Sequence, residues 1–461
     1  MKLGGLLLAL VLVGPVLAGT GAALPDDHPV RDVDHPDPGH SPSFALFPTH
    51  EEVQDAVKDH ADHPWVTVHH LGNSTEGRSI DVLEITDPES PVPMDERVVT
   101  FIFTQQHGNE PAGTPAALDV LDEITSGDSL ADLLANQILL LLPMANPDGA
   151  QADERHNAQD RDINRDHIGL ETPEARAIHE VLTRWDVHVA MDHHEYGGIG
   201  AGNPVPVRAY DYDLTTLFPR HGNVRAEALD AAKGLMYDGI WPAAQEAGYS
   251  ANEYGEQTAA GVPVQQIAGG PDPGIMRNHL GLHHVAGLLV ETRIDAHPNP
   301  FHDAERREAI HKVVMDATLA YASEHAPALI QAKQASKAAT LTAPDTAYIE
   351  GDIQAALAPS YMVGNAEGLD EVLALHGLPG TSAMEPAVLV PVAHDHQGHA
   401  AAIVHPDSTR SVVDDAKPLY PEEDEALATN QAATSGQDIP GIGAWVALAL
   451  VAITALSTRR S

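Results

Sequence analysis

Two short stretches of this chain consist almost entirely of apolar residues, and they constrain its fold more than any other feature. Residues 98–103 are apolar except for Thr100, and residues 138–142 are apolar throughout. Such strands need cover on both faces, which is typical of central strands flanked by helices. We therefore expect an α/β fold with a mixed, mostly parallel central sheet. Strands are expected at 65–71, 80–85, 97–104, 137–143, 187–191 and 286–291, and helices at 114–124, 173–185, 224–247 and 304–324.

The composition excludes several classes of function. Of the 461 residues, 43% are hydrophobic, enough for a sizeable core. The 67 acidic and 25 basic residues give a formal charge of −42, which opposes binding to nucleic acid. Cysteine is absent, so a metal ion would have to be held by His, Asp and Glu.

The two ends predict export and a membrane tether. A lysine, an apolar run and small residues predict a signal peptide over 1–23, followed by an acidic, proline-rich leader over 24–42. An acidic linker over 414–438 leads to a hydrophobic anchor or sorting tail over 439–461, which ends in an arginine pair. This tail resembles the archaeal PGF-type sorting signal, with Ile442 where that signal has Phe, so retention and removal of the tail both stay open.

Between the ends we expect two parts. The α/β domain is placed at 43–326, and a small accessory β-rich module at 327–413. The module contains His394, His396 and His399, which could bind a second metal, although a solvated polar loop is the simpler interpretation. The adjacent pair His283 and His284 is given no function.

Polar motifs follow several of the expected strands. His107 and Glu110 follow the strand over 98–103, and Asn146-Pro147-Asp148-Gly149 follows the strand over 138–142. Asp192-His193-His194-Glu195 and Glu291 follow two later strands. Because ligands bind beyond the carboxyl ends of such strands, these motifs can converge on one cleft. Two His and one Glu around an ion with one open position are the ligands of a catalytic zinc site.

The order of these motifs resembles the zinc carboxypeptidase family typified by carboxypeptidase A. The resemblance covers roughly residues 50–325 and includes the turn Ser74–Arg78 and the helix start at Thr172–Ala177. It implies that His107, Glu110 and His194 hold Zn²⁺. The neighbouring His193 leaves the choice of the second histidine open from the residues alone, whereas the Asp-x-His motif of the family selects His194. Asp162 would orient His107.

The resemblance also implies roles in catalysis and substrate binding. Glu291 would be the general base, and Arg155 would polarise the scissile carbonyl. Asn164 and Arg165 would bind the terminal carboxylate of the substrate. The downstream tyrosine of the family has no clear counterpart, and Tyr249, Tyr254, Arg277 and His279 are the candidates for its place.

We therefore expect an extracellular, surface-tethered zinc metallocarboxypeptidase that acts on the C-termini of peptides or proteins. One alternative is a zinc-dependent amidohydrolase that acts on cell-wall peptides or acyl amino acids. Another is a degenerate family member that only binds peptides. The oligomeric state stays open.

Overall fold

The computed structural model describes most of the chain between residues 46 and 419. The expected signal peptide, leader and C-terminal tail lie outside the described residues, as do most of the acidic linker and residues 394–396. Within the described part, no helix is both long and apolar enough to cross a membrane. The described residues are 46–197, 207–209, 212–258, 263–265, 270–294, 297, 299–341, 346–350, 353–356, 360–364, 368–378, 381–384, 387–391, 397–409, 411–413 and 416–419.

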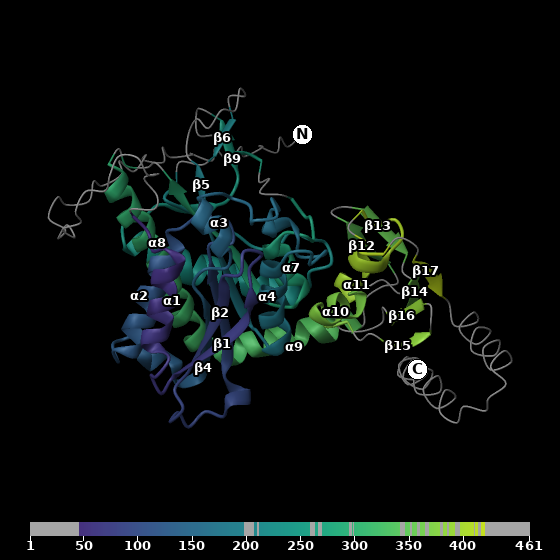
Figure 1. Ribbon diagram of the computed structural model, residues 1–461, viewed down its shortest axis with the longest axis horizontal. Coiled ribbons are helices and arrows are strands. Elements are labelled where there is room, and N and C mark those ends of the chain that lie inside the picture. Colours follow the sequence, from purple (N-terminus) through teal and green to yellow (C-terminus); the bar gives the residue numbers. More distant parts are fainter. Residues whose placement is uncertain are drawn as a thin grey trace, which may run out of the picture. The chain divides into compact units, whose positions relative to one another are not determined.

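An eight-stranded sheet runs through the α/β part (Figure 1), in the order β1-β2-β4-β3-β5-β11-β7-β8. The inner strands β4, β3, β5 and β11 pair in parallel, as do β7 and β8, whereas β1–β2, β2–β4 and β11–β7 are antiparallel. The expected mixed, mostly parallel sheet is confirmed. The strands are β1 Val66–Asn73, β2 Ser79–Ile85, β3 Val98–Thr104, β4 Gln137–Leu142, β5 Val189–Gly197, β7 Leu214–Leu217, β8 Ala251–Glu253 and β11 Ala286–Ile294.

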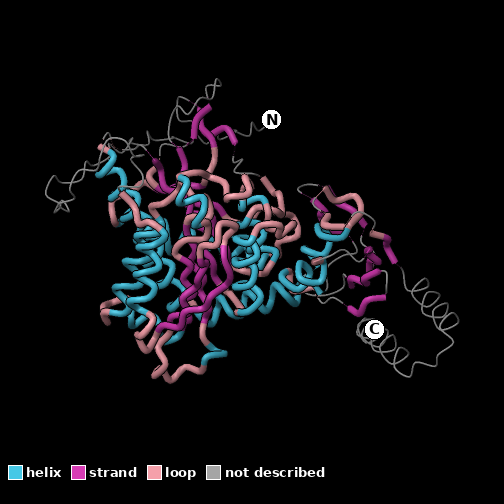
Figure 2. Tube along the Cα trace, viewed as in Figure 1, coloured by secondary structure: helices cyan, strands magenta, loops and turns pink. Residues whose placement is uncertain are grey.

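Helices cover both faces of this sheet (Figure 2), which explains the two apolar stretches: every residue of β3 and β4 is buried. On one face α1 (His50–His60), α2 (Gly113–Thr125) and α8 (Pro300–Glu324) pack on side chains such as Ile102 and Leu139. On the other face α4 (Pro173–Arg184) and α7 (Met276–Leu282) pack on Phe101 and Leu140. Successive side chains of a strand therefore enter different cores.

The other helices complete the α/β part. The helix expected over 224–247 is interrupted, because α5 and α6 are joined by a π-helical turn at Leu235–Ile240. A small sheet of three strands, in the order β10-β9-β6, lies apart from the main sheet. The bounds are α3 Pro147–Ala152, α5 Ala226–Gly234, α6 Trp241–Glu246, α9 Ala326–Leu341, β6 Val207–Ala209, β9 Glu256–Thr258 and β10 Pro263–Gln265.

The chain beyond α9 forms a C-terminal module with its own small core, which includes Tyr361, Leu373 and Ile403. Ile168 of the α/β part belongs to the same core, and Arg176 on α4 pairs with Glu371 at 2.7 Å. The module is thus packed directly on the α/β part. Its elements are β12 Thr346–Glu350, β13 Ile353–Ala356, β14 Ser360–Gly364, α10 Leu369–Leu375, β15 Thr381–Met384, β16 Ala387–Pro391, α11 Gln397–Val404 and β17 Lys417–Leu419.

Two of the polar motifs lie elsewhere than the sequence suggested. Asp192–Glu195 and Glu291 were expected after strands, but they lie within β5 and β11, which continue to Gly197 and Ile294. Strand pairing therefore fixes their positions directly. In the register, Glu291 is paired with His194, and Thr104 at the end of β3 is paired with His193.

The turn after β3 passes very close to the start of α3. A Cβ atom on Gly108 would lie 1.9 Å from the backbone carbon of Gly149 and 2.3 Å from the nitrogen of Ala150. Only glycine fits here, because these backbone atoms cannot move aside as a flexible side chain could.

We predict that Gly108→Ala destabilises the protein by about 3 kcal/mol or more and weakens metal binding, because the turn that carries His107 must shift. Gly127→Ala is the control: that residue has a φ of +78° and open space around it, so only backbone strain of about 1–2 kcal/mol applies. Denaturant unfolding and metal analysis of both variants measure the difference. Equal losses in the two variants would contradict the close approach.

Candidate active site

Three side chains that the sequence selected as metal ligands meet at the carboxyl edge of the sheet. His107 and Glu110 lie in the turn after β3, and His194 lies on β5. The Nδ1 atom of His107 is 2.9 Å from one oxygen of Glu110, and the Nδ1 atom of His194 is 2.7 Å from the other. The two Nδ1 atoms are 3.0 Å apart, and all three residues are buried. They form one group of potential metal ligands.

Two carboxylates orient the histidines. Asp162 lies 3.1 Å from Nε2 of His107, and Asp192 lies 2.9 Å from Nε2 of His194. An ionised carboxylate only accepts hydrogen bonds, so Nε2 of each histidine can donate to its aspartate, and Nδ1 is then the nitrogen that faces Glu110 and would bind a metal ion. The position of Asp162 agrees with the role suggested for it. The orienting role of Asp192 was missed, although its spacing of two residues from His194 places both on one face of a strand.

The charges around the three ligands favour a cation between them. Burial alone would raise the pKa of Glu110, but the adjacent His107 and His194 hold that pKa well below its usual range. Burial alone would lower the pKa of His194, but Asp192 and Glu110 raise it well above the ordinary value. The same field that favours a proton on His194 favours a metal ion beside it. Two imidazole nitrogens and one carboxylate suit Zn²⁺, so the residues fit the expected cofactor.

A second layer of hydrogen bonds holds Asp192 in place. The side-chain nitrogen of Gln106 donates to both oxygens of Asp192 at 3.0 and 3.1 Å. Its oxygen must then accept, and Nε2 of His167 lies 2.6 Å from it. His194, Asp192, Gln106 and His167 thus form one continuous, buried chain of polar contacts.

Strand geometry places the two adjacent histidines on opposite faces of β5. His193 points to the opposite face of β5 from His194, and its Nδ1 atom lies 2.8 Å from Nδ1 of His311 on α8. His193 is therefore not one of the three residues that meet at the centre.

Glu291 lies directly beside the metal ligands, on the strand that pairs with β5. Its register partner is His194, and the residue is 8% exposed. One carboxylate oxygen is buried without a hydrogen-bond partner. Burial raises the pKa of Glu291 to about 8, against the opposing effect of His194. A cation held by the three ligands would lower this pKa toward neutrality, where a carboxylate serves well as a base.

Arg155 lies beside the ligands and is partly exposed to solvent. Its guanidinium donates to Asp162 at 2.9 and 3.2 Å, and its Nη1 atom lies 3.0 Å from Nδ1 of His107. The side chain is 40% exposed, so the cation is accessible to a substrate. Burial alone would raise the pKa of Asp162. The hydrogen bond and charge of His107, together with the charge of Arg155, instead keep this pKa far below its usual range.

Asn164 and Arg165, the two residues expected to bind the terminal carboxylate, lie in different environments. The side-chain nitrogen of Asn164 lies 3.1 Å from Nε2 of His194, and its oxygen accepts from the backbone of Met276 at 2.8 Å. Asn164 is buried, whereas Arg165 is exposed. Arg277, which the sequence offered only as a lid candidate, is buried, and burial together with Arg165 and Arg220 lowers its pKa to about 10.

Among the four candidates for the missing tyrosine, Tyr254 has the most direct relation to the site. The charge of Glu291, burial and the charge of Glu110 together hold the pKa of Tyr254 well above its ordinary value. Its backbone is fixed to Thr216 of β7 at 2.9 Å. The position of Tyr254 after the short strand β8 gave no sequence pattern from which this proximity could be inferred.

The turn at Ser74–Arg78 clamps the start of α3. Asp148 accepts from the Ser74 hydroxyl at 2.6 Å, from the backbone of Glu76 at 2.9 Å and from Arg78 at 2.6 Å. These motifs, about seventy residues apart in sequence, therefore form one unit behind the site.

Comparison with known proteins identifies this arrangement. Residues 56–170, which include His107, Glu110 and Asp162, match the zinc carboxypeptidase family. This part of the chain is therefore similar to that family. The zinc carboxypeptidase match and the His-Glu-His group together support zinc as the cofactor.

Curated relatives are similar to this chain over about half of its length. Carboxypeptidase 2 of Trichophyton equinum is 29% identical over 236 residues, which cover 50% of this chain and 44% of that protein. The protein of the same name from Trichophyton rubrum is 28% identical over the same length. The chain thus matches less than half the length of these relatives. A metallo-carboxypeptidase from Burkholderia cenocepacia is similar in structure at 17% identity, with a TM-score of 0.46, covering 59% of this chain and 69% of that one.

We predict that His194→Gln removes one equivalent of bound zinc per chain, because Gln cannot replace the imidazole nitrogen that faces Glu110. His193→Gln is the matched control, since it changes the adjacent residue on the opposite face of β5. Elemental analysis after dialysis in limiting zinc distinguishes the two. Loss of the ion in the His193 variant alone would refute the assignment.

Proposed function

We propose that this chain is an exported zinc metallocarboxypeptidase that hydrolyses C-terminal peptide bonds. The observation that carries the proposal is the unpaired, buried oxygen of Glu291 beside a group of two histidines and a glutamate. The family match over residues 56–170 supports the same reaction class.

Zinc held by His107, Glu110 and His194 would act as a Lewis acid toward the scissile carbonyl and lower the pKa of a water in the cleft. Glu291 takes a proton from the attacking water as the oxygen of that water bonds to the carbonyl carbon. Glu291 then gives this proton to the amine as the carbon–nitrogen bond breaks. A base with a pKa near neutrality suits both steps, and burial of Glu291 moves its pKa in that direction.

Three arginines would stabilise negative charge, both on the carbonyl oxygen during the reaction and on the terminal carboxylate of the substrate. Arg155 lies next to the metal ligands, where a fixed cation stabilises negative charge that develops on the carbonyl oxygen. Arg165 is exposed and can form paired hydrogen bonds with a terminal carboxylate. Arg277, whose pKa is lowered in part by Arg165, adds positive charge nearby. Asn164, fixed between His194 and Met276, would support this region rather than offer a free amide.

The proposals that the protein is exported and attached to the membrane rest on its sequence. The apolar run after Met1-Lys2 supports export, and the apolar segment before Arg459-Arg460 supports attachment to the membrane. Cell fractionation of the full chain, with and without residues 439–461, tests the tether: the shortened protein should appear in the medium.

We predict that Glu291→Gln lowers kcat by 10²–10⁴-fold or more while zinc stays bound, because the variant keeps the shape of the side chain but cannot accept the proton. Glu253→Gln, on the nearby strand β8, is the control, since Glu253 bonds to Tyr237 in an exposed contact. A C-terminal peptide library analysed by mass spectrometry, with and without chelator, gives the activity. Wild-type turnover in the Glu291 variant would refute its role as the base.

We predict that Arg165→Ala raises KM about 10–100-fold for peptides with a free C-terminal carboxylate, with a much smaller effect on C-terminal amides. Arg161→Ala is the control, because Arg161 lies on the same loop but pairs with Glu171. Equal losses for both substrate types would favour an amidohydrolase that does not bind the terminal carboxylate.

A further inference from the structure

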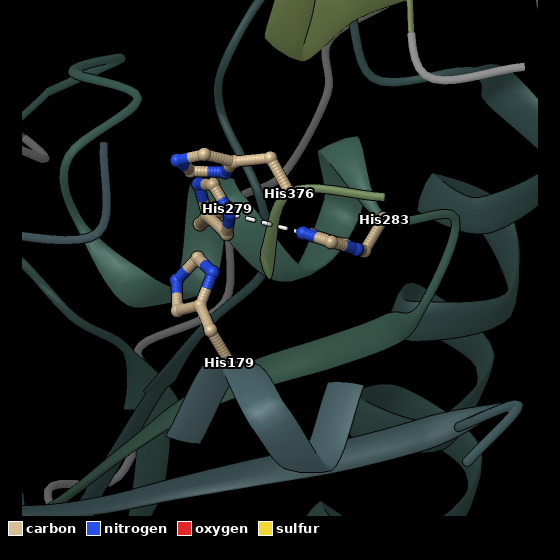
Figure 3. Close-up of side chains that lie close together, drawn as sticks. All are labelled: His179, His279, His283 and His376. Atoms are coloured by element: carbon tan, nitrogen blue, oxygen red, sulfur yellow. Dashed lines mark hydrogen bonds between the residues drawn. The ribbon is translucent and has the colours of Figure 1, made fainter. Parts of the chain in front are cut away.

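A second group of potential metal ligands lies outside the active site and consists only of histidines (Figure 3). His179 lies on α4 and His279 on α7, whereas His283 directly follows α7 and His376 directly follows α10 in the C-terminal module. Each offers a ring nitrogen, and these four atoms all lie within 4.8 Å of one another. All four residues are buried, at 0 to 4% exposure. We call this group the four-histidine cluster.

Contacts with backbone carbonyls orient two of the rings. Nδ1 of His279 lies 3.3 Å from the carbonyl of Pro273, and Nε2 of His376 lies 2.9 Å from the carbonyl of Ile168. A carbonyl only accepts hydrogen bonds, so these nitrogens carry the protons and the opposite nitrogens carry lone pairs. Metal-binding histidines are commonly oriented in this way. His279 and His283 are one helical turn apart, and their Nε2 atoms face each other at 3.0 Å (Figure 3).

His179 is difficult to explain as an ordinary core residue. Both of its ring nitrogens are buried and have no hydrogen-bond partner of normal geometry, although the backbone of Leu375 is a weaker polar contact. Its ring packs 4.5 Å from that of His279 and 5.1 Å from that of His376. Burial of unsatisfied nitrogens costs free energy that an apolar side chain at this position would avoid. A ligand within the cluster would offset that cost.

We propose that the four-histidine cluster is a second metal site, which binds a divalent transition metal ion that favours imidazole ligands: zinc, nickel or copper. Four neutral imidazoles suit these ions, whereas Mg²⁺ and Ca²⁺ require oxygen ligands. Four protein ligands leave no open position on a tetrahedral ion, so the site is structural rather than catalytic. The charge of −42 on the whole chain favours uptake of a dication.

The ion would fasten the C-terminal module to the α/β part. Three ligands come from α4, α7 and the residue directly after α7, and the fourth, His376, directly follows α10. The first residue of α7, Met276, donates its backbone N–H to Asn164 beside the metal ligand His194. The ring of His167 packs 5.5 Å from that of His179 and leads through Gln106 and Asp192 to His194. Loss of the ion should therefore loosen α10 first and the substrate-binding loop second.

The test uses the full chain carrying His194→Gln, so that only the second site can hold metal. After loading with zinc and dialysis, we expect one equivalent of zinc per chain, and none in His194→Gln/His376→Gln. The control His194→Gln/His221→Gln changes another buried histidine outside the cluster and should keep the ion. Equal zinc content in all three proteins, or no zinc in the His194 variant, would overturn the proposal.

A second measurement leaves the cluster intact, in case the His376 variant does not fold. Chelator-treated His194→Gln protein is titrated separately with zinc, nickel, copper, magnesium and calcium. We expect the Tm to rise by about 5 °C or more with zinc, nickel or copper, and not with magnesium or calcium.

Two further measurements locate the bound ion. Amide exchange at residues 368–378 should slow with the same ion that raises the Tm. For the copper-loaded protein, electron paramagnetic resonance should show coupling to several imidazole nitrogens. No stabilisation by any transition metal would refute the site.

Discussion

The pairing of β5 with β3 on one side and β11 on the other is the constraint on which the active site depends. The parallel register places Glu291 beside His194, and the end of β3 brings the turn with His107 and Glu110 to the same edge. A shift of one residue in β5 would exchange His194 for His193 and turn the metal ligand toward α8. The hydrophobic cores on both faces resist such a shift, because each strand residue is fitted to its own layer of helices.

The groups that support the ligands come from distant parts of the chain. Asp162 and Asp192 orient one histidine each, while the clamp on Asp148 holds the start of α3 against Gly108. These contacts are buried or partly buried, so the ligands are held in position before an ion binds. This support fixes the geometry of the zinc site. Substitutions at supporting residues that do not contact the metal would therefore also weaken metal binding.

The sequence predicted the parts of the fold that depend on local pattern. The apolar runs at 98–103 and 138–142 are central strands, and Thr172 before Pro173 starts α4 with its side chain as the N-cap. The ligand group His107, Glu110 and His194 was found from motif order. Tyr254 and Arg277 were named only as two of four candidates for the missing tyrosine, because their position depends on how the chain returns to the sheet after β8. The four-histidine cluster was also missed: only His279 and His283 have helical spacing, and the others are about one hundred residues away in either direction.

The polar chain behind His194 also limits proton movement inside the protein. Gln106 lies between Asp192 and His167: its side-chain nitrogen donates to Asp192, and its oxygen accepts from His167. An amide in this setting cannot relay a proton as an imidazole or a water molecule could, so Gln106 interrupts proton transfer along this chain of contacts. A proton on His167 therefore has no route to Asp192 through Gln106. Changes of protonation in the histidine-rich interior are thereby separated from His194 along this chain of contacts.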